Sequence, residues 1–73
     1  MNLKDYTNKE GMSIRELSDI TGVAYPQLYR IAKDVNYNVT IKTMTKIASG
    51  TQAHRGKALM PWEYLDVAFL NNI

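Results

Sequence analysis

Apolar residues recur at helical spacing in four stretches of the first 50 residues. The spacing predicts helices over residues 2–9, 13–20, 24 or 25 to 32, and 40–50, with a polar, Asn-rich loop from Lys33 to Val39. The residues expected to face the core are Leu3, Tyr6, Met12, Ile14, Leu17, Ser18, Thr21, Val23, Leu28, Ile31, Ala32, Val35, Ile41, Met44, Ile47 and Ala48.

Residues that start or stop helices stand at the ends of these stretches. Ser13 and Glu16 have the spacing of a capping box, and Thr40 is a good N-cap for the fourth helix. Gly22 stands where the second helix must end, and Pro26 fits the first turn of the third. The sequence therefore predicts two short helices joined by a tight turn, the layout that places one helix in the major groove of DNA.

The chain from Thr51 to Met60 lacks strong periodicity and contains Gly56, which favours a loop. Arg55 and Lys57 make this loop basic. We leave two interpretations open for it, a solvated connection or an additional arm that contacts phosphates.

Pro61 begins a last element, for which Pro at the first position and Glu63 in the first turn favour a helix. Alternating apolar residues also allow an edge strand. Residues 60–71 hold more apolar side chains than one face of a short helix buries, which indicates packing or dimerisation. The dimer residues expected here are Trp62, Leu65, Phe69 and Leu70; the alternative is that Trp62, Leu65 and Phe69 only cap the core.

Length and composition indicate one small domain spanning residues 1–73, of which 45% are hydrophobic. The chain has no cysteine and one histidine, so we expect neither disulfides nor a metal site. It shows neither a membrane-length apolar run nor the apolar segment of a signal peptide, and we expect a cytoplasmic protein that binds no membrane.

Basic charge is concentrated in the middle of the chain. Residues 28–58 hold six basic side chains and one acidic one, whereas residues 1–27 and 59–73 each carry a slight negative excess. A basic segment of this kind is what contact with DNA phosphates requires, although a solvated helix surface would give the same count.

The stretch from Ser13 to Ile31 resembles the lambda-repressor/Cro-like, or XRE-type, helix-turn-helix domains. The matching positions are Leu17-Ser18, Gly22-Val23, Leu28 and Ile31, and the likeness covers roughly residues 3–50. Two residues depart from the family pattern, because Ser18 replaces the commoner Ala and Pro26 stands where a polar side chain usually faces DNA.

The resemblance implies a compact all-α domain of four to five helices, with the helix-turn-helix at about residues 13–33. It implies a transcriptional regulator, such as a small phage or mobile-element repressor of the Cro/CI type, that acts by operator occupancy. Such a protein would bind double-stranded DNA as a homodimer, with recognition helices about 34 Å apart. No cofactor or small-molecule ligand is expected.

Side-chain chemistry then selects the expected DNA contacts. Gln can pair with adenine and Arg with guanine, and hydroxyl, amide and ammonium groups bind phosphate oxygens. The expected base contacts are Tyr25, Gln27, Tyr29 and Arg30, and the expected phosphate contacts are Lys33, Asn36, Asn38, Lys42, Thr43 and Lys46.

Other classes of function find little support in the sequence. It lacks a Gly-rich phosphate loop, and a nucleophile with its base cannot be assembled, so we expect no enzyme and no catalytic residue. The competing hypothesis is a helix-turn-helix scaffold that binds protein, such as an antirepressor or inhibitor. The low net charge, Pro26 and the outward tyrosines favour it.

Overall fold

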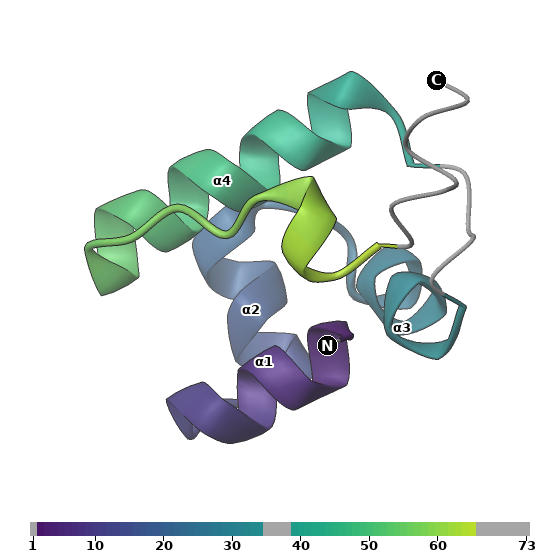
Figure 1. Ribbon diagram of the computed structural model, residues 1–73, viewed down its shortest axis with the longest axis horizontal. Coiled ribbons are helices and arrows are strands. Elements are labelled where there is room, and N and C mark those ends of the chain that lie inside the picture. The colour runs from purple at the N-terminus through teal and green to yellow at the C-terminus, as the bar shows by residue number, and fades with distance from the viewer. Residues whose placement is uncertain (1, 35–38, 66–73) are drawn as a thin grey trace.

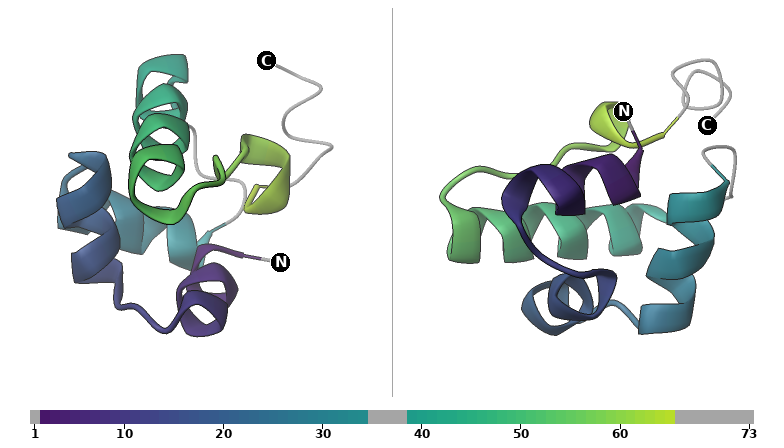
Figure 2. Two further views of the ribbon diagram at one scale, coloured as in Figure 1. Left: turned by 90° about the vertical axis from the view of Figure 1, so that its left-hand side faces the viewer. Right: turned by 90° about the horizontal axis from the view of Figure 1, so that it is seen from below.

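The computed structural model describes residues 2–34 and 39–65. These residues form the helices α1 (Leu3–Glu10), α2 (Ile14–Thr21), α3 (Tyr25–Lys33) and α4 (Ile41–Arg55), and one 3-10 turn, η1 (Pro61–Glu63). After α4 the chain turns back along this helix to reach η1 (Figures 1 and 2). No strand occurs in the described stretches, and the all-α fold with a helix-turn-helix is confirmed. No helix there is both long enough and apolar enough to cross a membrane.

Side-chain caps fix the start of three helices. The Asn2 side chain accepts a hydrogen bond from the Asp5 backbone at 2.9 Å, and the Asp5 carboxylate accepts one from the Asn2 backbone at 3.1 Å. The Ser13 hydroxyl accepts from the backbone N–H of Glu16 at 3.1 Å, which is the serine half of the predicted capping box. Thr40 caps α4 as predicted. Each cap satisfies a backbone donor that the helix itself leaves unpaired.

The core lies where the helices and the chain after α4 meet. Most of the predicted inward residues are buried there, and three residues from the C-terminal part close the core. The buried apolar residues are Leu3, Tyr6, Met12, Leu17, Val23, Leu28, Ile31, Val39, Ile47, Leu59, Tyr64 and Leu65. One expectation is wrong: Ile41 is 71% exposed. The side of α4 that carries Thr43, Ile47 and Gly50 faces the protein, and Ile41 lies off that side.

The fourth helix is longer than predicted. It does not end at Gly50 but continues to Arg55, where Gly56 caps it. Gly50 instead marks the crossing of α4 over α2, because a Cβ built on it would lie 2.3 Å from the backbone oxygen of Ile20 and 2.6 Å from the Cα of Thr21. This glycine allows two backbones to touch, so it does not act here as a helix stop.

The predicted loop is correspondingly shorter, since residues 51–55 are helical. Thr51 is fully buried on α4, and its hydroxyl donates to the carbonyl oxygen of Ile47 at 2.7 Å. The hydroxyl oxygen of Thr51 also accepts a hydrogen bond from the backbone N–H of Leu59 at 2.7 Å. This pair of bonds fastens the returning chain to α4.

The last predicted element begins at Pro61 as expected, and its described part, residues 61–65, contains one 3-10 turn and neither a longer helix nor a strand. Glu63 accepts from the Met60 backbone at 2.8 Å, which closes the turn. Leu65, expected at a dimer surface, is 5% exposed and packs inside its own chain. The remaining predicted residues of the element, 66–71, lie outside the described residues.

Gly50→Ala should destabilise the protein although alanine is the better helix former. The added methyl meets backbone atoms of Ile20 and Thr21, which cannot move unless α2 moves away from α4. Overpacking of this kind costs about 1–3 kcal/mol. We expect the melting temperature to fall by about 5–20 °C. The control is Ser49→Ala, one residue earlier and exposed, which should keep or slightly raise the melting temperature.

Tyr64→Phe should be tolerated at neutral pH and should change the alkaline limb of the stability curve. The Tyr64 hydroxyl is buried and has no hydrogen-bond partner among the described residues, and burial raises the pKa of this phenol well above its ordinary value. Above about pH 10 the unfolded chain releases this proton while the folded chain retains it, so the wild type loses stability as pH rises.

Urea unfolding of both proteins from pH 7 to pH 11 measures this effect. The variant should be at least as stable as the wild type at pH 7 and should lose less stability above pH 10. Lysines titrate in the same range but are common to both proteins. If the free energy of unfolding fell equally with pH in both proteins, or if the variant were clearly less stable at pH 7, the raised pKa of the buried Tyr64 phenol would be contradicted.

Candidate nucleic-acid interface

The turn between α2 and α3 is held by side chains as well as by its glycine. Gly22 adopts φ +75°, a left-handed conformation that glycine takes without strain, and its N–H donates to Ser18 O at 2.9 Å. The Ser18 hydroxyl donates to Val23 O at 2.6 Å, and Thr21 Oγ1 accepts from the Val23 N–H at 3.3 Å. Ser18, which departs from the usual alanine, therefore braces the turn.

Helix α3 buries one side and exposes the other, as predicted. Leu28 and Ile31 are buried against the core, whereas Pro26 and Arg30 are exposed. The hydrogen-bonding inventory of this outer side includes a guanidinium, two phenols, an amide and an ammonium. Of the five α3 residues predicted to contact DNA, four are exposed: Tyr25, Tyr29, Arg30 and Lys33.

Tyr25 and Tyr29 form a stacked pair flanked by two cations. Their ring centroids lie 6.2 Å apart at an interplanar angle of 23°. The Arg15 guanidinium from α2 lies 5.1 Å from the Tyr25 ring, and the Lys33 ammonium lies 5.1 Å from the Tyr29 ring. The i, i+4 spacing of Tyr25, Tyr29 and Lys33 could have predicted this row, whereas the contact from Arg15 required the structure.

This aromatic and basic row forms one wall of a groove between α1, the start of α2, and α3. The groove has a volume of 540 Å³. Lys4 and Asn8 line it from α1, and Arg15 lines it from α2. It thus combines flat aromatic faces with positive charge.

Gln27 differs from the other residues predicted on the outer side of α3. It is half-buried, and its amide Nε2 donates to Thr43 Oγ1 on α4 at 3.2 Å. Thr43 is itself 8% exposed. The structure therefore joins a predicted base contact directly to a predicted phosphate contact, a link that the sequence alone did not reveal.

The other predicted phosphate contacts fall into two groups. Lys33, Lys42 and Lys46 are exposed on α3 and α4. Asn36 and Asn38 lie outside the described residues.

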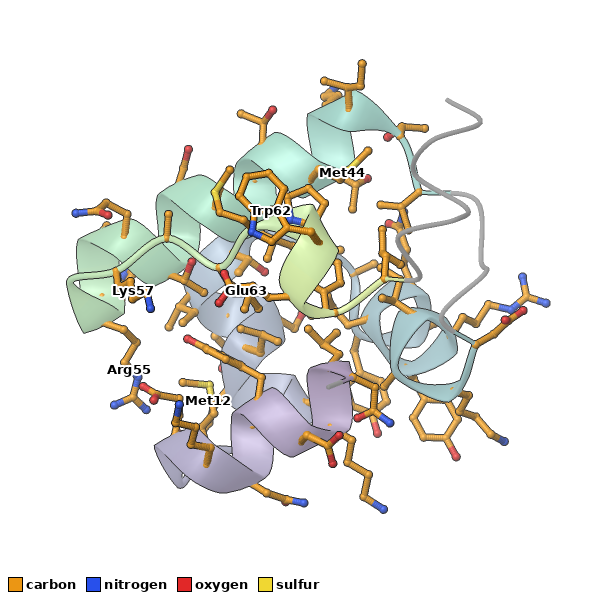
Figure 3. All side chains as sticks on the ribbon, in the orientation of Figure 1. Met12, Met44, Arg55, Lys57, Trp62 and Glu63 are labelled. Atoms are coloured by element: carbon orange, nitrogen blue, oxygen red, sulfur yellow. The ribbon has the colours of Figure 1, made fainter. Side chains whose placement is uncertain are left out.

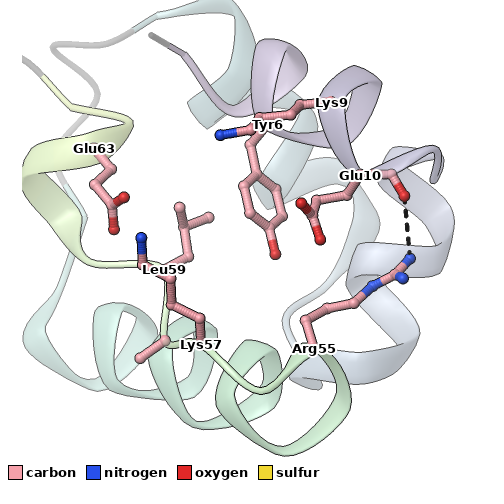
Figure 4. A pocket seen from close by; sticks show the side chains of 8 residues that line it. Tyr6, Lys9, Glu10, Arg55, Lys57, Leu59 and Glu63 are labelled. Carbon is pink, nitrogen blue, oxygen red and sulfur yellow. Dashed lines mark hydrogen bonds between the residues drawn. The ribbon is translucent and has the colours of Figure 1, made fainter.

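Arg55 and Lys57 lie at the far end of α4 from Thr43, away from α3 (Figure 3). They line a separate cleft of 270 Å³ together with Tyr6, Glu10 and Glu63 (Figure 4). The Arg55 guanidinium donates to the Glu10 carbonyl oxygen at 3.5 Å. Burial, followed by the negative charge of Glu10, raises the pKa of the Tyr6 phenol. Because this cleft carries charges of both signs, it does not extend the basic surface beside α3.

Of the predicted dimer residues, Trp62 is the exposed one within the described part of the chain, at 60%. It projects from η1 on the side of the molecule that Figure 3 turns toward the viewer. An apolar groove of 290 Å³ lies between α4 and the start of η1, lined by residues that include Ile41, Met44 and Pro61. Phe69 and Leu70 lie outside the described residues.

Comparison with known proteins agrees with this arrangement. The family model of the Cro/C1-type HTH DNA-binding domain matches residues 2–52, which include all of α1, α2 and α3 and most of α4. No curated protein and no solved structure matches the chain. The chain therefore belongs to the family of Cro/C1-type helix-turn-helix DNA-binding domains.

Proposed function

We propose that the protein is a sequence-specific regulator of transcription, a repressor of the small Cro/CI type that acts by occupying an operator. The observation that carries the proposal is the outer side of α3, where Arg30 and two tyrosines are exposed beside Gln27 on a helix held by a braced turn. A helix presented in this way fits the major groove, where an Arg reads guanine and a Gln reads adenine.

The base contacts in this proposal are Tyr25, Gln27, Tyr29 and Arg30. The stacked tyrosines offer apolar ring surface to a thymine methyl and a hydroxyl to the sugar-phosphate backbone. Pro26 has no N–H to donate and contributes apolar contact at most.

The phosphate contacts are Lys33, Lys42 and Lys46, whose ammonium groups lie on exposed positions of α3 and the first half of α4. Each neutralised phosphate releases condensed counterions, which gives affinity for any duplex. Asn36 and Asn38, in the segment between α3 and α4, remain part of the proposal from their sequence position alone.

The protein acts as a homodimer in this proposal, with two copies of α3 in successive major grooves about 34 Å apart. Exposed Trp62 and the apolar groove beside α4 support a contact between copies, because an exposed apolar patch marks interaction sites. Operator occupancy then excludes polymerase or a competing regulator, in the cytoplasm and without a cofactor or small-molecule ligand.

A second candidate function is a helix-turn-helix scaffold that binds another protein, as an antirepressor or inhibitor does. The observation that favours it is the tyrosine-lined groove beside α1, since aromatic residues and arginine are enriched in the centres of protein interfaces. Absence of binding to duplex DNA even at low salt would favour this candidate.

Arg30→Ala should weaken operator binding without unfolding the protein. Loss of a bidentate contact to guanine costs about 1–3 kcal/mol. The operator is first selected from a random duplex pool, and its affinity is then measured across a salt series by fluorescence anisotropy. For the wild type, the logarithm of the association constant should fall linearly with the logarithm of the salt concentration.

The control is Arg55→Ala, which removes the same charge at the distant cleft and should leave operator specificity unchanged. If the two variants lost operator affinity equally, the proposed role of Arg30 in reading a base would be refuted. Thermal unfolding of both variants should resemble that of the wild type, because both arginines are exposed.

Trp62→Ala should shift the protein from dimer to monomer and weaken binding to a palindromic operator more than binding to one half-site. Removal of a large exposed ring takes apolar area from the proposed contact while the core stays intact. Sedimentation velocity measures the oligomeric state, with Tyr29→Ala as the control for loss of an exposed aromatic elsewhere. A wild type that remains monomeric on a palindromic site would contradict the dimer.

A further inference from the structure

The link between Gln27 and Thr43 joins two helices at the proposed DNA surface. The Gln27 amide nitrogen donates to Thr43 Oγ1 at 3.2 Å, across 16 positions of sequence. Gln27 belongs to α3, and Thr43 lies in the first turn of α4. The amide of a proposed base-reading residue is therefore already in contact with its own protein before DNA arrives.

Thr43 is in turn fixed by the cap of α4. The Thr40 hydroxyl accepts from the Thr43 backbone N–H at 3.2 Å and donates to Thr43 Oγ1 at 3.1 Å. Thr43 is buried, and threonine is stiff about its first side-chain torsion. The position of its oxygen is thus set by the backbone at the start of α4.

The hydrogen bond that Gln27 donates to Thr43 leaves part of the amide able to pair with a base. An amide nitrogen carries two protons and the amide oxygen accepts, so one N–H and Oε1 remain after the bond to Thr43. This donor and acceptor are the pair that a glutamine uses against N7 and N6 of adenine in the major groove. A side chain that is ordered beforehand also loses less conformational freedom on binding.

We propose that Thr43 is a positioning residue that holds the Gln27 amide in the orientation for reading adenine, so that the first turn of α4 sets a base preference of α3. The specificity part of this proposal rests on the proposed function. In this proposal Thr43 acts through Gln27 and not as the phosphate contact expected from the sequence, since its side chain is only 8% exposed and its hydroxyl oxygen accepts from Gln27 and Thr40.

The test compares Thr43→Val with Thr43→Ser on the selected operator. Valine keeps the shape of threonine but offers no acceptor, whereas serine retains the hydroxyl. We expect valine to reduce the preference for adenine at one position by about tenfold, within the range that a bidentate pair supplies, and serine to restore most of it. The salt dependence should not change, because no phosphate contact is lost.

Two controls separate positioning from a structural effect. Thr45→Val makes the same substitution at an exposed position of α4, where the hydroxyl donates to Ile41 O at 2.9 Å, and should leave adenine preference intact. In a Gln27→Ala background, Thr43→Val should cause no further loss of specificity, since the residue through which it acts is gone. Replacing the adenine by 7-deazaadenine should abolish the difference between wild type and Thr43→Val.

A loss that is uniform over all duplex sequences, or one that persists in the Gln27→Ala background, would overturn the proposal. The side-chain amide protons of Gln27, observed by NMR in the DNA-free protein, test the contact independently. In the wild type and in Thr45→Val, the rotation of this amide should be restrained and its proton chemical shifts should differ from those of an exposed glutamine. In Thr43→Val neither effect should be seen. Unrestrained Gln27 protons in the wild type would also overturn it.

The NMR result separates two kinds of failure. If no DNA sequence is selected, the proposed function fails and the reading of adenine fails with it. The hydrogen bond between α3 and α4 is still decided by the DNA-free spectrum. If a sequence is selected but carries no adenine sensitive to Gln27, the proposed function stands and the positioning proposal is overturned.

Discussion

The contact between the backbones of α2 and α4 at Gly50 is the constraint on which the rest of the arrangement depends. With glycine at the crossing, α4 approaches α2 closely enough that no side chain fits between them. α2 is joined to α3 by the braced turn at Gly22, so the position of α4 against α2 also sets its position against α3. The hydrogen bond between Gln27 and Thr43 forms because α2 holds both α3 and the first turn of α4 at the right positions.

The C-terminal part of the described chain completes the core rather than adding a further layer. Leu59, Tyr64 and Leu65 are buried, and the bond from Leu59 to Thr51 fastens this segment to α4. A chain of this size buries a small core, so three additional apolar residues are a substantial share of it. Part of the apolar surplus near the C-terminus is therefore buried within the chain, whereas Trp62 is exposed.

Local signals in the sequence predicted most of the helices, since caps at Ser13 and Thr40 and the turn at Gly22 act over a few residues. Gly50 was misread because a glycine that ends a helix and one that permits close packing look alike in sequence. Ile41 was misread because helical periodicity does not indicate which of two neighbouring sides faces the protein. The partners of Gln27 and Arg15 depend on how separate helices pack, which a one-dimensional pattern does not contain.

The two ends of α4 differ in electrical character. Lys42 and Lys46 stand near its start, where the bond between Gln27 and Thr43 joins α4 to α3, the helix that carries Arg30 and Lys33. At the other end, the cleft beside Arg55 is lined by two further lysines and by two glutamates. Basic side chains therefore stand without nearby glutamates at one end of a helix about 22 Å long, and are partly offset by glutamates at the other. A charge distribution of this kind favours orientations in which the end that carries α3 faces a polyanion.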